Sequence, residues 1–375
     1  MGRKAIEMLL QEPRKLADCG CFPTPLHRLN RLSQELGCNI FLKRDDLTGL
    51  GFSGNKIRKL QYLVQDALDR GCTTLLTYGG VQSNHARQTA AVAAKYGLRS
   101  VLIATLKTDR PPAALSGNLL LDAILNCDVI FMDTSSIQAQ AGRRTPDEIE
   151  AETARLRRRA ADLVIREYEA KGERVYEIPA GGSTPLGCLG YFYAVPEIMQ
   201  QLAEMGQTVD YLICPSGSKG TFSGLWLGAR YFQAPFQVVG SCVSPHGDAY
   251  RESVRGLIGE MCELYGLGTP PAADELCLYC SEYSGPAYDT PDPLTFETIY
   301  RLALAEGLFV DPCYSAKGLT ALLKLVEDHT IPAGSNVLFI HTGGLPALYS
   351  EQHLAQFNRD LWGSRQHRVI SLPVE

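Results

Sequence analysis

The sequence predicts an α/β fold built mainly from parallel strands. Short runs rich in Leu, Ile and Val alternate with longer segments of helical periodicity along the chain. Parallel strands are buried on both faces and need a crossover between neighbours, so this alternation is typical of βαβ units. The runs expected to be strands cover residues 40–43, 74–78, 100–104, 129–132, 175–178, 211–214, 237–243 and 336–341.

Helices are expected where apolar residues recur at helical spacing and where helix-ending residues follow. The charged segment Pro146–Lys171 is expected to be a surface helix, after which the chain enters a second sheet. Residues 247–293 contain many Gly, Pro and Tyr and are expected to be irregular, as a lid, an oligomer contact or a long loop. The other expected helices are Lys56–Arg70, Asn84–Tyr96 and Asn118–Leu125.

The composition is that of a soluble globular protein whose partner is a small molecule. Hydrophobic residues make up 45% and charged residues 21% of the 375 residues, enough for one large or two medium domains. A net charge of −5 gives no general attraction to nucleic acid or to an anionic membrane surface. No apolar stretch has the length of a signal peptide or a membrane span, so the expected location is the cytoplasm.

The twelve cysteines are scattered along the chain and are expected to be reduced, mostly buried thiols. Cys277 and Cys280 form a CxxC pair, but no second pair follows at the spacing of a zinc site. We therefore expect no metal.

An amine suited to covalent catalysis is expected at Lys56, which follows Gly54 at the start of a predicted helix. The helix macrodipole and the charges of Arg58 and Lys59 should lower the pKa of this amine, and the neutral form is the one that attacks an aldehyde. The alternative is that the three basic residues form only a solvated helix face. Residues 49–54 also match G-x-G-x-x-G, but the strand that follows lacks the acidic residue with which a dinucleotide site holds the ribose.

Two further segments follow predicted strands and carry anion-binding groups. Ser83, Asn84 and His85 open a helix after a double glycine, where free N–H groups can bind a carboxylate. A plain N-cap would explain Ser83 alone. Residues 215–224 follow strand 211–214 and have the glycines and hydroxyls of a phosphate cradle without a Walker A pattern. A phosphate loop without nucleotide machinery, together with Lys56, indicates pyridoxal 5'-phosphate.

Several motifs in this order resemble the aminocyclopropane-carboxylate deaminase/D-cysteine desulfhydrase family over roughly residues 20 to 350: residues 54–60, 82–94, 181–187, 311–314 and 341–344. The resemblance implies a two-domain, three-layer fold of open twisted sheets that is tryptophan-synthase-β-like, the fold type II of pyridoxal-phosphate enzymes, and normally a homodimer. The small domain would comprise residues 58–172, inserted into a large domain built from residues 1–57 and 173–375.

The resemblance also assigns roles. Lys56 would form the Schiff base with the cofactor, Asn84 would bind the ring hydroxyl, Ser83 would touch the substrate, and Gly217 to Thr221 would hold the phosphate. The implied catalytic residues are Lys56, Ser83, Tyr288 and Tyr314. The implied cofactor site comprises Lys56, Asn55, Asn84, Gly217, Ser218, Lys219, Gly220, Thr221, Ser315 and Thr342, and the implied substrate site Ser83, Asn84, His85, Tyr288 and Tyr314.

Two positions bear on the reaction. The deaminases of the family have a Glu after the tyrosine that corresponds to Tyr314, whereas this chain has Ser315, which can only hydrogen-bond the ring nitrogen. They also have Gln at the position of His85. The leading expectation is therefore β-elimination from a small amino acid by a D-cysteine desulfhydrase that gives pyruvate, ammonia and hydrogen sulfide. Lys56 would remove the Cα proton, with Ser83 as the alternative, and the two tyrosines would orient the substrate or protonate the leaving group.

Other functions stay open on the sequence alone. One is a 1-aminocyclopropane-1-carboxylate deaminase. Another is an L-cysteate sulfo-lyase, in which the charge of Lys219 would assist a departing sulfite. Racemase or dehydratase activity on serine-like substrates and a catalytically silent protein that binds pyridoxal phosphate are the remaining alternatives.

Overall fold

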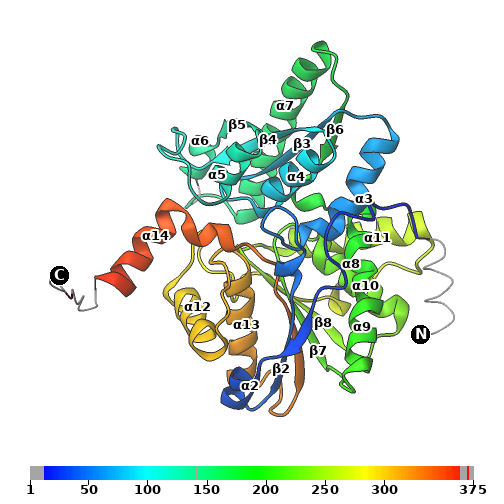
Figure 1. Cartoon of the computed structure of the whole chain (residues 1–375), viewed down its shortest axis with the longest axis vertical. Coiled ribbons are helices and arrows are strands. Elements are labelled where there is room, and N and C mark those ends of the chain that lie inside the picture. The colour runs from blue at the N-terminus through cyan, green and yellow to red at the C-terminus, as the bar shows by residue number, and fades with distance from the viewer. Residues whose placement is uncertain (1–11, 141, 364–369, 371–375) are drawn as a thin grey trace, which may run out of the picture.

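The computed structural model describes residues 12–140, 142–363 and 370, and these residues form two sheets with helices packed around them (Figure 1). The larger sheet has six strands in the order β1-β2-β10-β7-β8-β9. Every neighbouring pair is parallel except β1 and β2. Its strands are β1 (Leu26–Arg28), β2 (Asn39–Lys43), β7 (Tyr211–Ser216), β8 (Gln237–Cys242), β9 (Cys277–Tyr279) and β10 (Asn336–Ile340).

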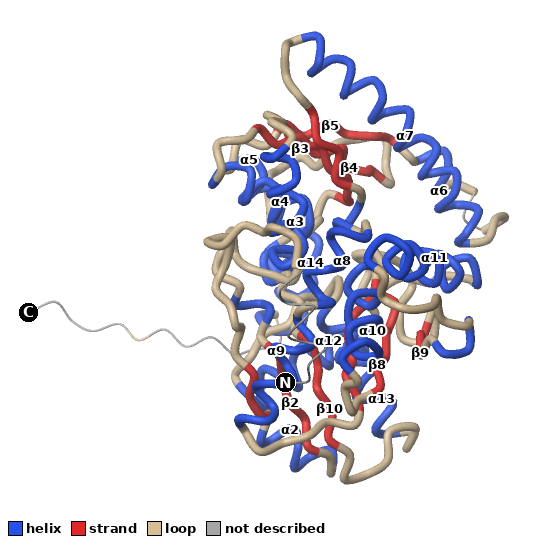
Figure 2. Tube along the Cα trace, turned by 90° about the vertical axis from the view of Figure 1, so that its right-hand side faces the viewer, coloured by secondary structure: helices blue, strands red, loops and turns tan. Residues whose placement is uncertain are grey.

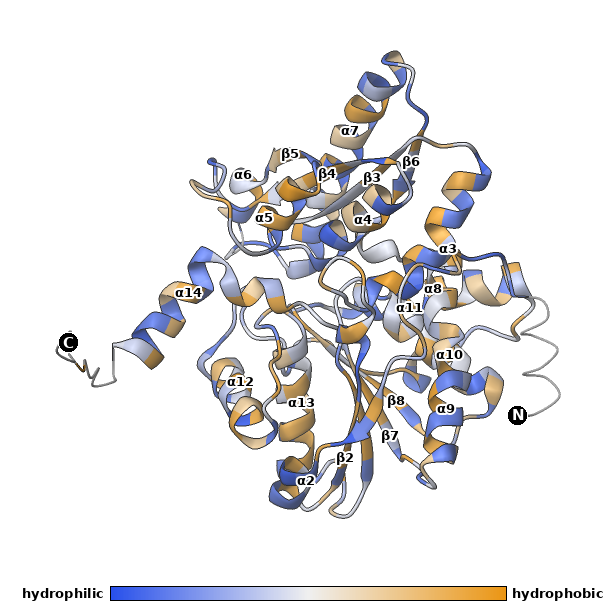
Figure 3. Ribbon diagram, in the orientation of Figure 1, coloured by the Kyte–Doolittle hydropathy of each residue, from blue (hydrophilic) through white to orange (hydrophobic). Residues whose placement is uncertain are grey.

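Helices cover both faces of the larger sheet and make it the middle of three layers (Figures 1 and 2). One face packs against α8, α9, α10 and α11, and the other against α2, α12 and α13. Figure 3 shows the strands as a largely hydrophobic layer between these helices. The helices are α2 (Asn30–Leu36), α8 (Pro185–Phe192), α9 (Ala194–Glu204), α10 (Gly220–Phe232), α11 (Asp248–Tyr265), α12 (Pro293–Glu306), α13 (Ser315–Glu327) and, beyond them, α14 (Glu351–Phe357).

The smaller sheet has four parallel strands in the order β5-β4-β3-β6. One face packs against α3 and α4 and the other against α7, which is the long helix at the top of Figure 1. Its elements are β3 (Thr74–Gly80), β4 (Arg99–Leu106), β5 (Asp128–Asp133), β6 (Val175–Ile178), α3 (Lys56–Asp69), α4 (Asn84–Lys95), α5 (Gly117–Ile124), α6 (Ser135–Gln138) and α7 (Pro146–Ala170).

The strand that follows α7 differs from its prediction. We expected the chain to enter a second sheet there, but β6 pairs with β3 and completes the smaller sheet. A strand of four residues does not reveal in its own sequence which sheet it joins, because its partner is remote along the chain. The limits of the two domains stay a prediction, but the strand pairing favours a limit after Ile178 instead of after residue 172.

The prediction that residues 247–293 are irregular is wrong for their first part. Residues 248–265 form α11, which buries Tyr250, Val254, Ile258 and Met261 on one face. All the Pro residues of the segment and half of its Gly residues lie after this helix, around the short strand β9. Two short strands, β1 and β9, were not predicted, because three residues are too few to show a strand's alternation.

Within the described residues, no helix combines the length and the apolar character that crossing a membrane would need.

Candidate active site

The predicted site residues gather where the carboxyl ends of strands from both sheets meet. Strand β7 leads into the loop before α10, β10 leads into residues 341–344, and β3 leads into the start of α4. Such edges are where α/β sheets bind their ligands, because loops and helix N-termini converge there. A pocket at this place is lined by Asn55, Lys56, Pro215, Ser216, Gly217, Ser218, Lys219, Thr221, Tyr314 and Thr342.

Lys56 is the first residue of α3 and is held by a residue from another helix. Asn55 provides no side-chain cap for α3. Instead the amide oxygen of Gln88, on α4, accepts the backbone N–H groups of Lys56 and Ile57 at 3.0 and 3.2 Å. Gly54 has φ of +131°, and a Cβ on it would lie 2.6 Å from Gln88 Nε2, so the turn before Lys56 needs glycine.

The amine of Lys56 is buried and directed into the pocket. Lys56 Nζ donates to Asn55 Oδ1 at 3.2 Å and lies 5.8 Å from the ring centre of Tyr314. Burial, followed by the positive charge of Lys59, lowers the pKa of this amine well below its ordinary value. The expected neutral, nucleophilic amine therefore fits its surroundings, although burial contributes more than the neighbouring charges on which the prediction rested.

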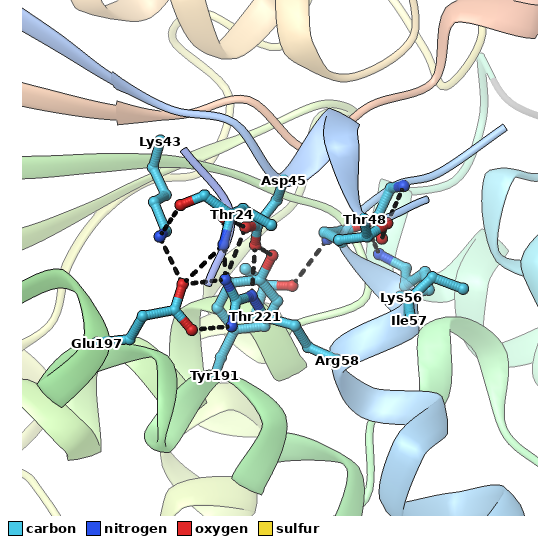
Figure 4. A network of polar contacts seen from close by, with 12 residues as sticks. Thr24, Lys43, Asp45, Thr48, Lys56, Ile57, Arg58, Tyr191, Glu197 and Thr221 are labelled. Carbon is cyan, nitrogen blue, oxygen red and sulfur yellow. Dashed lines mark hydrogen bonds and ion pairs between the residues drawn. The ribbon is translucent and has the colours of Figure 1, made fainter. Parts of the chain in front are cut away.

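The alternative of a solvated basic face is wrong, because Arg58 and Lys59 are both buried. Arg58 forms ion pairs with Asp45 and Glu197 over 2.8 Å each, as Figure 4 shows. Lys59 Nζ donates to the carbonyl of Gly181 at 3.0 Å. The basic residues after Lys56 thus anchor α3 to the turn after β2, to α9 and to residues 180–182.

The loop between β7 and α10 has the geometry of an anion cradle. The first turn of an α-helix leaves backbone N–H groups without partners in the helix, and α10 begins at Gly220 beside the pocket. Thr221 accepts a hydrogen bond from Asn55 Nδ2 at 3.1 Å, which ties the cradle to the turn before Lys56. Gly217 lies against Tyr314, whose ring would be 3.0 Å from a Cβ at that position.

Lys219 lies in this loop, but its amine points elsewhere. Its backbone has φ of +72°, and its Nζ donates to Ser253 Oγ on α11 at 2.6 Å. Another residue of α11, Tyr250, directs its hydroxyl to Ser216 Oγ and to the carbonyl of Gly217 at 2.8 and 3.3 Å. The segment expected to be irregular therefore supports the cradle, and neither Tyr250 nor Ser253 was singled out from the sequence.

Ser83, Asn84 and His85 lie together at the start of α4. Ser83 is the N-cap and accepts the N–H of Ala86 at 3.2 Å, and Asn84 Oδ1 accepts from Asn118 Nδ2 at 2.8 Å. Asn84 is close to Gly344, whose missing Cβ would lie 2.7 Å from Asn84 Nδ2. Gln88 Nε2 donates to the carbonyl of Asn84 at 2.9 Å, so the same residue holds this segment and Lys56.

His85 has a defined tautomer. Its Nε2 lies 2.9 Å from Thr77 Oγ1, and Thr77 gives its only hydroxyl proton to the carbonyl of Ile178 at 2.9 Å. His85 Nε2 must therefore be the donor, which leaves Nδ1 with a lone pair. That Nδ1 is buried without a hydrogen-bond partner. Burial, then the charges of Lys56 and Lys59, lower the pKa of His85 well below its ordinary value, so the ring is neutral.

The buried, neutral His85 predicts a loss of stability in acid. The unfolded chain binds a proton at His85 below a pH of about 6.5 and the folded chain does not, so the free energy of unfolding falls as the pH drops through that value. Protonation of His85 in the unfolded chain changes the free energy of unfolding by at most about 1.4 kcal/mol per pH unit. Urea unfolding of the cofactor-free protein between about pH 7.5 and about pH 5 should show a weaker acid loss for His85→Gln than for the wild type. Parallel curves would contradict a buried neutral imidazole.

Tyr288 and Tyr314 form an edge-to-face pair with ring centres 5.5 Å apart. Tyr288 lies against Gly80 at the end of β3, so the pair closes the space between the two sheets. Burial raises the pKa of both phenols, which keeps them protonated at neutral pH. The segments that carry them are joined behind the rings, because Cys313 Sγ donates to Asp289 Oδ1 at 2.6 Å.

Ser315 and Thr342 form a buried hydroxyl pair, of which Thr342 lines the pocket. Ser315 Oγ donates to the carbonyl of Gly343 at 2.9 Å and lies 3.2 Å from Thr342 Oγ1. Buried Asp311 fixes the start of α13 by accepting the N–H groups of Cys313, Tyr314 and Ser315. Ser315 and Thr342 thus contribute only neutral hydroxyls at this place.

The donor set fits a phosphorylated aldehyde. A neutral amine on a rigid helix start can attack a carbonyl carbon, and the first turn of α10 can bind a phosphate. The pocket is lined by eight predicted site residues: Asn55, Lys56, Gly217, Ser218, Lys219, Thr221, Tyr314 and Thr342. Gly220 lies between two of them, Ser315 contacts Thr342, and Tyr288 packs on Tyr314. Ser83, Asn84 and His85 start α4, the helix whose Gln88 holds the backbone of Lys56. Gln88 and Asp311 lie within motifs that carried the prediction, yet their positioning contacts were not foreseen because they depend on other elements.

Comparisons with known proteins agree with this geometry. A family model described as pyridoxal-phosphate dependent enzyme matches residues 19–343. A Thermotoga maritima protein provisionally named 1-aminocyclopropane-1-carboxylate deaminase is 38% identical over 335 residues, which cover 89% of this chain and 97% of that protein. A D-cysteine desulfhydrase of Yersinia enterocolitica is 37% identical over 329 residues, which cover 87% of this chain and 93% of that protein. The crystal structure of a homologue of ACC deaminase matches with a TM-score of 0.80 at 32% identity, over 97% of this chain and 99% of the other.

Proposed function

Because this chain belongs to the pyridoxal-phosphate-dependent enzymes, we propose that it is a lyase that eliminates the β-substituent of a small amino acid, with D-cysteine as the substrate. The family, its α/β fold of type II and its cofactor are as predicted from the sequence. The proposed reaction converts D-cysteine and water to pyruvate, ammonia and hydrogen sulfide.

The cofactor would be held by residues around the pocket. Pyridoxal phosphate, when bound, draws electrons from the Cα of an attached amino acid and makes its proton acidic. We assign the covalent attachment to Lys56, the phosphate to the loop Gly217–Thr221 and the ring hydroxyl to Asn84. The ring nitrogen would face the hydroxyls of Ser315 and Thr342. The lining of the pocket by Lys56, Thr342 and this loop supports the assignment.

The proton transfers would use Lys56 and the tyrosines. A neutral Lys56 amine can take the Cα proton, and its lowered pKa supports this role. Ser83 is the alternative base or relay, and its oxygen accepts the N–H of Ala86 at the start of α4. The phenols of Tyr288 and Tyr314 retain their protons at neutral pH, so either could protonate the leaving sulfur.

Ser315 is the observation that carries the choice of reaction. Its hydroxyl proton goes to Gly343, and neither it nor Thr342 can supply the negative charge that would keep a ring nitrogen protonated. With less electron withdrawal by the ring, a reaction in which a good leaving group departs from Cβ as the Cα proton is removed is favoured over one without such a group.

A panel of amino acids tests the proposal. Purified protein with its cofactor should release equimolar pyruvate and sulfide from D-cysteine, and L-cysteine, L-cysteate and 1-aminocyclopropane-1-carboxylate should react at least about tenfold more slowly, as expected for a difference of about 1.4 kcal/mol in transition-state binding. A four-carbon 2-oxo acid formed from the cyclopropane compound, with both cysteine isomers inert, would contradict the proposal.

The deaminase is the second candidate, because two of the similar proteins are named for that activity. Sulfite release from cysteate is less favoured, since Lys219 directs its amine to Ser253 on α11. We further propose a homodimer in the cytoplasm. The exposed Leu304, Phe309 and Tyr349 offer apolar surface for a dimer contact, which light scattering of the purified protein would measure.

A further inference from the structure

The two cysteines of the CxxC motif do not face each other. Cys277 lies in β9 and packs against the core on the side of α12 and α13, whereas Cys280 packs against the core on the side of α10 and α11. Residues three apart in an extended segment point to opposite faces, so the spacing alone accounts for this. The motif is therefore no dithiol in itself, and each thiol has its own surroundings.

Cys280 faces Cys242 instead. The parallel register between β8 and β9 pairs Ser241 with Tyr279, the last residue of β9, and Cys242 and Cys280 are the next residues in the chain after this pair. Adjacent strands are separated by about 4.8 Å, which is inside the Cα range of disulfides, about 4.4–6.8 Å. Both side chains pack on the same face, and each thiol is the largest influence on the pKa of the other.

The two thiols differ in the way that a reactive pair requires. A hydrogen bond from Cys242, followed by the charge of Arg251, lowers the pKa of Cys280 to about 7 against the opposing effect of burial. Cys280 is partly exposed, whereas Cys242 is fully buried and its pKa is raised. Thiolate character together with access determines which cysteine an oxidant reaches first, so Cys280 is the attacking thiol and Cys242 the resolving one.

We propose that Cys242 and Cys280 are a site of reversible oxidation by hydrogen peroxide that ends in a disulfide between neighbouring strands of the larger sheet. The Cys280 thiolate attacks one peroxide oxygen, the O–O bond breaks, and a sulfenic acid and hydroxide form. The sulfur of Cys242 then attacks the Cys280 sulfur. The S–O bond breaks, the S–S bond forms, and the hydroxyl leaves as water with the Cys242 proton. Two thiols are oxidised for each peroxide reduced.

Tyr250 connects this pair to the candidate active site. Its hydroxyl is hydrogen-bonded to Ser216 Oγ and to the carbonyl of Gly217, and Cys242 contributes to the raised pKa of this phenol. A disulfide would remove the Cys242 thiol from the surroundings of Tyr250 and draw the end of β8 toward the residue after β9, next to the loop proposed to hold the phosphate. This consequence rests on the proposed function: the oxidised, cofactor-free protein should bind pyridoxal phosphate several-fold more weakly than the reduced protein. Equal affinities would overturn this consequence, whereas the disulfide is tested independently of the cofactor.

Peptide mapping of the full-length protein tests the disulfide. After mild peroxide and alkylation of the remaining thiols, digestion should yield a peptide pair linked through Cys242 and Cys280, and dithiothreitol should abolish it. Cys242→Ser should stop the linkage and leave a Cys280 sulfenic acid that dimedone traps, and Cys280→Ser should stop both. Cys277→Ser is the matched control, since it removes the other CxxC thiol and should leave the linked pair unchanged.

Two results would overturn the proposal. One is a linked peptide that joins Cys277 to Cys280. The other is an absence of the Cys242–Cys280 link at a peroxide dose that oxidises other thiols, such as the exposed Cys21. Because serine is close to cysteine in size, the variants should fold, and the rate at which Cys280 of the wild type is alkylated relative to Cys277 gives a further measure that needs no substitution.

Discussion

Lys56→Ala is expected to lower turnover of the preferred substrate by at least about 10³-fold, because it removes the group proposed both to attach the cofactor and to move the Cα proton. The buried helix start should tolerate the change, since the backbone N–H groups of Lys56 and Ile57 keep their bonds to Gln88. Turnover should therefore fall without a comparable loss of folding stability. Borohydride reduction of the wild type, followed by peptide mapping, should find the cofactor on the peptide that contains Lys56.

Lys324→Ala is the control for this change. Lys324 lies on α13 and pairs at the surface with Glu327 over 2.9 Å, remote from the pocket. It should keep the turnover of the wild type, because a surface ion pair contributes little. Cofactor attached to a different lysine, or a Lys56→Ala variant with more than about a tenth of the normal turnover, which amounts to only about 1.4 kcal/mol, would contradict the role of Lys56.

Gly344→Ala should strongly destabilise the protein. Gly344 has φ of +102°, and a Cβ there would lie 2.5 Å from Cγ of Asp311 and 2.7 Å from Asn84 Nδ2. Asp311 cannot yield, because it is buried and accepts the N–H groups at the start of α13. Backbone strain of about 1–2 kcal/mol and overpacking of about 1–3 kcal/mol add to a loss of about 2–5 kcal/mol in the free energy of unfolding, measurable in urea.

Gly334→Ala separates strain from contact. Gly334 also has a positive φ, +81°, but nothing lies within 4 Å of the Cβ position. The Gly334→Ala variant should lose only about 1–2 kcal/mol in the free energy of unfolding, the cost of backbone strain alone. If the two variants unfold at the same urea concentration, the close approach of Gly344 to Asp311 does not constrain the protein.

Much of the fold could be predicted because its strands are buried on both faces and therefore appear in the sequence as short apolar runs. The eight predicted strands all occur, and their limits differ from the observed ones by two residues or fewer. What was missed depends on partners remote in the chain. The irregular appearance of residues 247–293 came mostly from the Gly and Pro residues after α11, and the placement of β6 depended on its pairing with β3.

The site could be predicted as far as local motifs reach. Lys56, Ser83 and the loop at Gly217 each come after a strand and at the start of a helix. A few consecutive residues are therefore enough to predict their chemical role. The directions of side chains are not local. Lys219 was expected to pair with the phosphate, to point to solvent or to assist a leaving group. Its amine instead donates to Ser253 on α11, a helix that the sequence analysis did not predict.

Gln88 couples the positions of α3 and α4 at the candidate active site. Its amide holds the first turn of α3 through the N–H groups of Lys56 and Ile57 and holds the first residue of α4 through the carbonyl of Asn84. The catalytic amine and the helix end that would receive the substrate carboxylate are therefore connected through a single side chain, Gln88. If α4 shifts when a substrate binds, the first turn of α3 should shift with it. Substrate binding and the position of the Lys56 amine are therefore coupled.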